Sequence, residues 1–195
     1  MKWLLICLFS GLIIYSCINN KTPDDNPDGQ PDENEISFAI SEHLFAGSAV
    51  QSIAFNNQDG YFYSVGNQII LIQSGNQGGS FSVNSEVYSM AFNQKDSSLY
   101  FGTKGSGLGR LHNNKITYFT VENSGLPRNL ITKVVCDAAG NVWFNSSASK
   151  LGGLMKYNGK TLEKFLPENS ALPGNIVYDI VAYREDVFVS VEDGR

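Results

Sequence analysis

Few side chains in this sequence are of the types that perform hydrolytic or transfer chemistry. Such chemistry usually needs a nucleophile beside a base, a pair of carboxylates or a cluster of metal ligands. The chain has two histidines, His43 and His112, and Cys136 is the single cysteine after residue 17. His112 stands where Tyr157 stands in a later, similar segment, which is typical of a packing or hairpin residue. We expect Cys136 to be a small buried apolar side chain. The sequence therefore predicts no catalytic residues.

One group of oxygen-bearing residues has the spacing of an EF-hand calcium loop: Asp24, Asn26, Asp28, Gly29 and Glu35. It would supply ligands at the first, third, fifth and twelfth positions. Such a loop needs a helix on each side, however, and here one proline precedes it and two lie inside it. Residues 18–35 also contain too few apolar side chains to offset the entropy of ordering. We therefore expect a solvated acidic spacer, with no metal and no cofactor.

The N-terminus has the form of an export signal, because Lys2 precedes an apolar run that is too short and too early to span a membrane. The run ends in Ile14, Tyr15, Ser16 and Cys17, which resembles the lipobox of bacterial lipoproteins. An ordinary secreted protein or a signal anchor is the alternative. The resemblance implies that residues 1–16 are a signal peptide and that Cys17 is the lipidation site. Its acyl chains would then hold residues 17–36, a flexible tether, to the lipid bilayer.

Acidic residues are concentrated in this tether, which holds six of the 19 in the chain. From Ser37 onward there are 13 acidic and 12 basic side chains, so the remainder is almost neutral and a nucleic-acid partner is not expected. An acidic stretch after the lipidated cysteine resembles the surface-export signals of Bacteroidetes lipoproteins. We expect an outer-membrane lipoprotein, either periplasmic or surface-exposed.

Residues 37–195 consist of short runs with period-two alternation, separated by Gly, Asn and Asp turns, which indicates an all-β domain. Three-residue motifs that begin with an aromatic residue and end with a small or polar one recur at steps of 38, 43 and 45 residues, and they begin at Phe62, Tyr100, Trp143 and Phe188. That period predicts a β-propeller built from four-stranded antiparallel blades.

A second phase of the repeat supports this, because Glu122–Leu130 recurs 46 residues later as Glu168–Ile176. Within the blade that follows Glu122 we predict four strands, at Leu130–Cys136, Asn141–Asn145, Gly153–Tyr157 and Leu162–Leu166. A two-residue Asn158-Gly159 turn would join the last two. The preceding blade is predicted at Val87–Phe92, Leu99–Gly102, Leu108–His112 and Ile116–Val121, and an earlier, degenerate blade at about residues 50–83.

This pattern resembles the two-component regulator propeller repeat. The matching positions are Asn123–Pro127, Asn129, Asp137, Gly140, Trp143, Gly153, Leu154, Tyr157 and Asn158. The sequence departs from the family at Asn145-Ser146, where Gly-Thr is usual, while Gly102-Thr103 keeps the usual pair. The family occurs in periplasmic sensor regions of Bacteroidetes hybrid histidine kinases and is associated with glycan sensing, although no kinase sequence is present here.

The repeat count amounts to about three and a half blades, whereas closure ordinarily needs about four or more. Either Ile36–Ile40 completes the last blade as a borrowed outer strand, or the natural protein is longer. We expect the longer protein.

Binding is the function that this pattern favours, because propeller loops around a central axis present aromatic rings and polar groups to ligands. Our candidate ligand-binding residues precede or begin the inner strands: Arg128, Asn129, Asn175 and Tyr178. Trp143 is a rival, but its place in the repeat favours the core. We expect a lipid-anchored propeller that binds or senses a carbohydrate or a protein partner. The alternatives are a polysaccharide lyase or glycoside hydrolase with catalytic residues beyond Arg195, and a scaffold without a small ligand.

Overall fold

A computed structural model of the protein describes residues 49–56, 58–146 and 152–192, together with the backbone of three short N-terminal strands. The chain forms two compact units, Met1–Ala49 and Val50–Arg195. In the first unit, β1 (Leu5–Ile6), β2 (Ile14–Ser16) and β3 (Ala39–Glu42) form an antiparallel sheet. Cys17, His43 and the acidic spacer lie outside the described residues.

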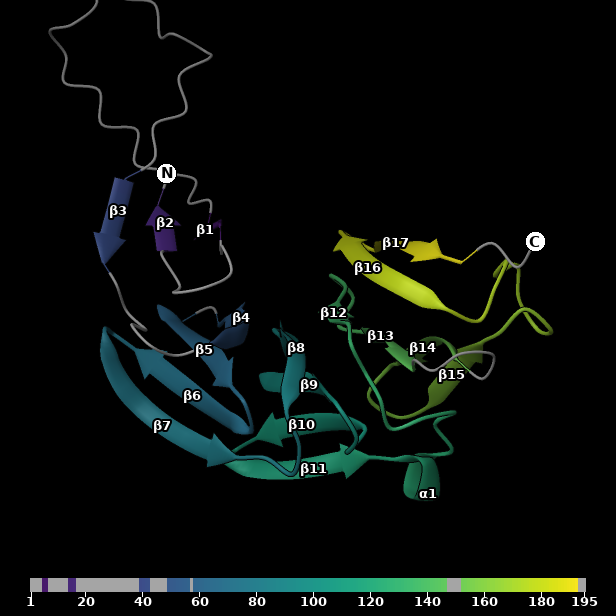
Figure 1. The fold of residues 1–195 in the computed structure, drawn as a ribbon, viewed down its shortest axis with the longest axis horizontal. Coiled ribbons are helices and arrows are strands. Elements are labelled where there is room, and N and C mark those ends of the chain that lie inside the picture. Colours follow the sequence, from purple (N-terminus) through teal and green to yellow (C-terminus); the bar gives the residue numbers. More distant parts are fainter. Residues whose placement is uncertain are drawn as a thin grey trace, which may run out of the picture. The chain divides into compact units, whose positions relative to one another are not determined.

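The second unit contains four antiparallel sheets, each formed by strands that are consecutive in the chain (Figure 1). We call them sheets 1 to 4. Sheet 1 consists of β4 (Val50–Phe55), β5 (Gly60–Val65), β6 (Gln68–Gln73) and β7 (Asn76–Ser82). Sheet 2 consists of β8 (Val87–Asn93), β9 (Ser98–Thr103), β10 (Leu108–His112) and β11 (Lys115–Phe119). Sheet 3 consists of β12 (Val134–Cys136), β13 (Val142–Ser146), β14 (Gly153–Tyr157) and β15 (Leu162–Phe165). Sheet 4 consists of β16 (Val177–Tyr183) and β17 (Asp186–Val191).

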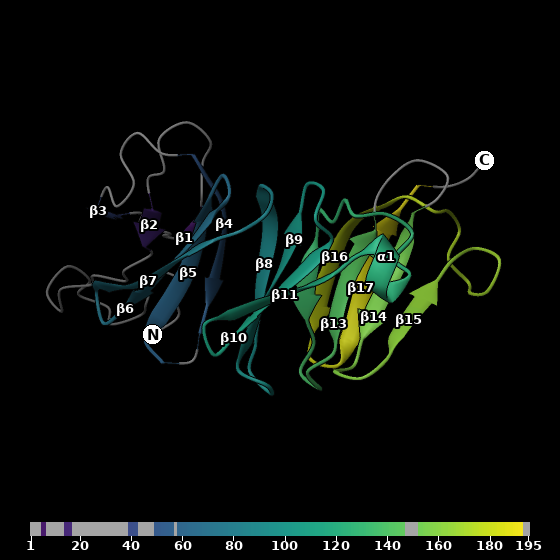
Figure 2. The ribbon, with the colours of Figure 1, turned by 90° about the horizontal axis from the view of Figure 1, so that it is seen from below.

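The first strand of each sheet is its inner strand, and the four inner strands β4, β8, β12 and β16 are neighbours in space. The fourth strands β7, β11 and β15 lie on the outside (Figure 1), and the sheets follow one another side by side (Figure 2). We call the face that each sheet turns to the preceding sheet its leading face, and the opposite face its trailing face.

Apolar side chains from facing sheets form the core, because alternate residues of a strand point to opposite faces. Between sheets 1 and 2, Phe62 and Ala54 pack with Met90, Leu99 and Phe101. A second cluster around Tyr100, Phe144 and Met155 lies between sheets 2 and 3, and a third around Leu154, Val177 and Ile180 lies between sheets 3 and 4. Each sheet thus depends on its neighbour for burial.

The predicted repeat is confirmed, with three complete four-stranded sheets and two strands of a fourth. The predicted bounds of β10 and β14 are correct. The strand predicted at Ile116–Val121 is wrong at its end, because it stops at Phe119 and a helical turn, α1 (Val121–Ser124), follows it. The borrowed strand is not seen, since Ala39 and Ile40 pair with β2 and, among the described strands, β16 pairs with β17 alone.

Two further predictions are corrected. The inner strand of sheet 3 begins at Val134 rather than Leu130, because the amides of Thr132 and Lys133 donate to Asn145 Oδ1, each over 2.9 Å, instead of to a strand. The Asn158-Gly159 segment is not a two-residue turn, because Tyr157 pairs with Leu162 across a longer connection. Asn158 Oδ1 accepts there from the amides of Lys160 and Thr161.

Candidate ligand-binding site

Three of the four inner strands, β4, β8 and β16, carry an irregularity at the same repeat position near their beginnings. The pairing register shifts between Val50 and Ser52, between Val87 and Ser89, and between Val177 and Asp179. The extra residues are Gln51, Tyr88 and Tyr178. A bulge of this kind re-aims a side chain and locally interrupts the ladder. Tyr178, a predicted binding residue, is therefore the counterpart of Tyr88, and its ring is exposed.

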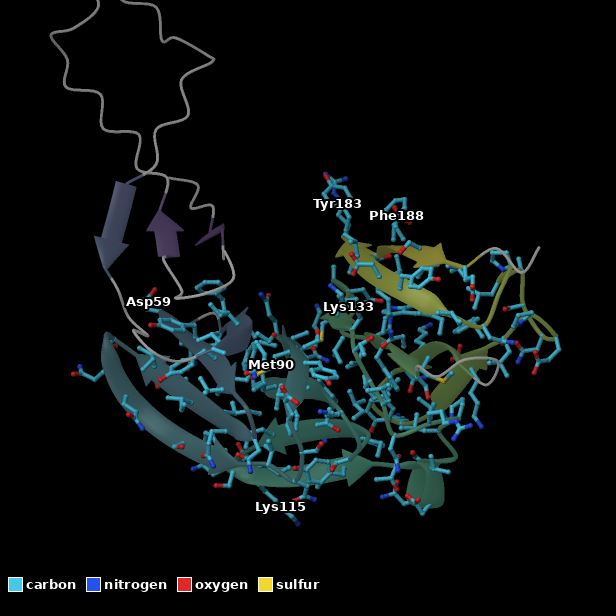
Figure 3. All side chains as sticks on the ribbon, in the orientation of Figure 1. Asp59, Met90, Lys115, Lys133, Tyr183 and Phe188 are labelled. Carbon is cyan, nitrogen blue, oxygen red and sulfur yellow. The ribbon has the colours of Figure 1, made fainter. Side chains whose placement is uncertain are left out.

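In sheets 1 and 2, the residue after the bulge joins its strand to the next inner strand. Ser52 Oγ accepts from Met90 N over 2.9 Å, and Ser89 Oγ accepts from Val134 N over 3.0 Å. In sheets 3 and 4 the same repeat position holds Lys133 and Asp179, whose Nζ and Oδ1 atoms lie 2.9 Å apart. Figure 3 labels Met90, which lies on β8, and Lys133, which directly precedes β12. We call Ser52, Ser89, Lys133 and Asp179 the inner ladder.

The charges in the inner ladder remain in contact with solvent, since both Lys133 and Asp179 are partly exposed. The hydrogen bond from Lys133 is the main cause that lowers the pKa of the Asp179 carboxyl below its usual range, and the amide of Ile180 adds to it. The Asp179 carboxyl is thus ionised at neutral pH, and both side chains of the pair are accessible from solvent.

Glu86 and its two partners, Gln51 and Lys104, form another polar group at the same end of the inner strands. Gln51 Nε2 donates to Glu86 Oε1 and Lys104 Nζ lies near Glu86 Oε2, both over 3.4 Å. These long, solvent-exposed contacts contribute little stability. We call the bulge residues, the inner ladder and Glu86 the axial rim.

Two of the predicted residues, Arg128 and Asn129, lead into sheet 3 at this end. The amide of Arg128 donates to Ser146 Oγ, and Ser146 Oγ donates back to the Arg128 carbonyl, so the backbone is held while the side chain is exposed. Asn129 has a structural task, because its Oδ1 accepts from Val121 N over 2.8 Å at the start of α1.

Asn175 is the repeat counterpart of Asn129, but it cannot make the same bond. Pro167 stands where Val121 stands one repeat earlier, and proline has no amide hydrogen to donate. The two asparagines are therefore equivalent in sequence and different in use. Of the two, Asn175 is the better candidate for a ligand contact.

The repeated Asn-Ser pair that precedes each of these segments is structural. Asn123 Oδ1 accepts from Thr120 N and Asn169 Oδ1 accepts from Leu166 N, both over 2.8 Å. Ser124 and Ser170 each donate to the carbonyl four residues earlier. These side chains fix the chain reversal between sheets, which explains why the motif recurs.

No family model and no curated protein matches the sequence. Solved structures do match its fold. The extracellular domain of BT4673 from B. thetaiotaomicron superimposes with a TM-score of 0.58 at 17% identity, over 98% of this chain and 27% of that domain. YCF48 bound to D1 peptide gives a TM-score of 0.56 at 15% identity, over 76% of this chain and 50% of YCF48. The designed protein Ika4 gives 0.57 at 16% identity, over 78% of this chain and 91% of Ika4.

The fold is a β-propeller. Sheets 1 to 3 are complete blades and sheet 4 contributes two strands. At these identities the likeness concerns the fold alone, and the chain spans about half the length of YCF48 and about a quarter of the BT4673 domain.

Within the propeller, Trp143 is a packing residue, as its place in the repeat predicts. Its indole N–H donates to Asp137 Oδ2 over 2.8 Å and its ring stacks on Phe165, with centroids 5.6 Å apart. His112 is held in its hairpin, where Nδ1 lies 3.0 Å from Ser98 Oγ. Ser98 is fully buried and belongs to a network with Arg110 and Asp96, so this Ser-His pair is not open to a substrate.

Sequence reasoning missed Lys133, which pairs with Asp179 in the axial rim. The available signal was the repeat spacing, because Lys133 is 44 residues after Ser89 and 46 before Asp179. Among the described residues there is no group of three potential metal ligands and no helix long and apolar enough to cross a bilayer.

Proposed function

We propose that the protein is a lipid-anchored extracytoplasmic propeller that binds a ligand at the axial rim. The observation that carries the proposal is a contrast between repeat positions. In the chain reversals between sheets, the position that holds the backbone keeps its chemistry, as Asn123 and Asn169 show. Rim positions do not, and the bulge alone carries Gln51, Tyr88 and Tyr178. Chemical diversity on an invariant backbone is what a recognition surface requires.

The ligand class that suits this surface carries several hydroxyl or amide groups, as a carbohydrate or an extended peptide does. Exposed tyrosine can stack on an apolar sugar face or on a peptide side chain. Lys133 in the rim offers hydrogen bonds, as do Arg128 and Asn175, which precede the inner strands at the same end. Propellers of similar fold include YCF48 bound to D1 peptide, and BT4673, described as part of a one component or hybrid two component system. These likenesses support a binding or sensory role.

The test is a glycan array followed by a peptide library. We expect Arg128→Ala and Tyr178→Ala each to weaken binding about tenfold, which corresponds to about 1.4 kcal/mol. Asn175→Ala should lower affinity at unchanged stability. Its counterpart Asn129→Ala should lower the free energy of unfolding by about 1 kcal/mol, because a backbone cap is lost. Full binding by both Arg128→Ala and Tyr178→Ala would overturn the site.

The anchor has its own test. We expect Cys17→Ser to abolish labelling of the protein by a clickable palmitate analogue and to release it from the membrane fraction. Unchanged labelling would show that Cys17 is not the lipid site. Protease treatment of intact cells separates a surface-exposed protein, which is cleaved, from a periplasmic one, which is spared.

A further inference from the structure

Asn158-Gly159 is the one Asn-Gly pair in the sequence, and it is a chemically reactive unit. The backbone nitrogen that follows an asparagine can attack the side-chain carbon Cγ and displace the amide nitrogen. Glycine hinders this attack least, because it has no Cβ beside the attacking atom. The pair lies in the connection between β14 and β15, where both residues are exposed. A Cβ added at Gly159 would meet nothing within 4 Å, so the space beside it is open to water.

The folded connection holds both polar atoms of the Asn158 side chain. Oδ1 accepts from the amides of Lys160 and Thr161 over 3.0 and 2.8 Å. Nδ2 donates to Thr161 Oγ1 over 2.8 Å. When Gly159 N adds to Cγ, Oδ1 becomes an oxyanion, and two backbone donors already lie at the distance that stabilises such a charge. The leaving nitrogen lies against a hydroxyl that can donate a proton to it.

Asn56 provides an internal comparison. Its Oδ1 also accepts from two backbone amides, those of Gln58 and Gly60, over 3.0 and 2.9 Å. The residue that follows it is Asn57, whose Cβ hinders the attacking nitrogen. The two asparagines thus share the pair of donors and differ in the attacking residue. Of the two, Asn158 alone combines the donors with a following glycine.

We propose that Asn158 is a modification site, at which the folded connection promotes conversion to aspartate or isoaspartate with loss of ammonia. The bond between Gly159 N and Cγ forms, and the bond between Cγ and Nδ2 breaks. Gly159 N loses its proton to solvent, while Nδ2 gains one through the Thr161 hydroxyl, which solvent reprotonates, and leaves as ammonia. Water then opens the succinimide ring, at Cγ to give aspartate or at the main-chain carbonyl carbon to give isoaspartate. One water is consumed, one ammonia is released, and the site gains a negative charge.

The modification site is separate from the axial rim. Tyr157, the last residue of β14, pairs with Val142, which pairs with Cys136 at the end of β12. The rim lies at the beginning of that inner strand. The modification therefore does not depend on what the rim binds, and its failure would leave the proposed function as it stands.

The test is incubation of the full chain in a non-ionic detergent at pH 8, followed by proteolysis and mass spectrometry of the fragment that carries residue 158. A synthetic peptide of residues 156–161 in the same buffer is the unfolded reference. We expect Asn158 to be converted about tenfold faster in the folded chain than in the peptide, because the donors at Oδ1 are already in place. Asn56 should remain unmodified over the same time.

Thr161→Val removes the hydroxyl beside Nδ2 and keeps the backbone amide, so it should slow the conversion severalfold. Thr117→Val is the matched control, because it makes the same change at an exposed position of β11, and its Asn158 should convert at the wild-type rate. Circular dichroism shows whether each variant is folded. The proposal would be overturned by an unmodified Asn158, by conversion no faster than in the peptide, or by a folded Thr161→Val variant that keeps the wild-type rate.

Discussion

Lys133 Nζ lies 2.9 Å from Asp179 Oδ1 and joins the inner strands of sheets 3 and 4, where earlier sheets use a serine hydroxyl and a backbone amide. The ion pair therefore replaces a neutral hydrogen bond at the end of the inner strands that carries the candidate site. Because the pair contains the Asp179 carboxylate, its contribution to stability depends on pH, unlike that of the neutral hydrogen bonds.

Stability should accordingly fall in acid. The pKa of Asp179 is lowered in the folded protein, so the pair contributes fully above the unfolded-state value of about 3.9 and its contribution is lost as the pH falls through the folded-state pKa. Because the pair is partly exposed, we expect Asp179→Asn to cost less than about 1 kcal/mol at pH 7. Urea unfolding of Asp179→Asn, Lys133→Met and the double variant at pH 7 and pH 3 measures this. An equal cost at both pH values would contradict it.

Asp137 should matter more to stability than Asp179. Its carboxylate accepts from Trp143 Nε1 and from both the amide and the side chain of Asn141, each over 2.8 Å. Burial alone would raise the pKa of Asp137, but these hydrogen bonds lower it. We expect Asp137→Ala to lower the free energy of unfolding by about 2–4 kcal/mol, because donors are left unpaired. Trp143→Phe removes one donor and should cost less.

Ser64, Gly102 and Asn145 occupy the same repeat position in sheets 1, 2 and 3, and we expect substitution by alanine to change stability differently at each of them. Asn145 donates to Thr132 Oγ1 and to the Val177 carbonyl, so Asn145→Ala should cost about 2–4 kcal/mol. At Gly102 an added Cβ would lie 2.6 Å from the Ile131 carbonyl oxygen, so Gly102→Ala should cost about 1–3 kcal/mol. Ser64 Oγ is buried without a partner among the described atoms, so Ser64→Ala should be neutral or slightly stabilising. Thermal unfolding of the three variants tests the order.

Cys136 should be unreactive in the native protein. Burial is the main cause that raises the pKa of its thiol to about 12, and the charges of Asp96 and Asp137 add to this. Little of the reactive thiolate is therefore present at pH 8. In a background with both Cys7→Ser and Cys17→Ser, which leaves Cys136 as the one thiol of the sequence, we expect almost no reaction with a thiol reagent until urea unfolds the protein. Rapid labelling of the native protein would show that the strand is open.

The sequence predicted the repeat well where the signal was local. The bounds of β10 and β14 follow from alternating side chains between turn residues, and both are correct. The errors arose where a distant partner intervened. Residues 130–133 looked like a strand, but Thr132 and Lys133 bond to Asn145, which is more than ten residues away. The unusual residue at position 145 was visible in the sequence, but the hydrogen bond that Asn145 donates to the Val177 carbonyl was not.

The sequence by itself determined the period, the all-β fold and the residues that recur, because alternation and turn chemistry act over a few neighbouring residues. Only the tertiary structure decided how equivalent residues differ. Asn129 accepts from the amide of Val121 at the start of a helical turn, whereas a proline stands at the corresponding position for Asn175. Phe62 is buried, whereas Phe188 is exposed. The physical reason is that hydrogen-bond partners and burial are supplied by neighbouring sheets, and the four sheets do not have the same neighbours.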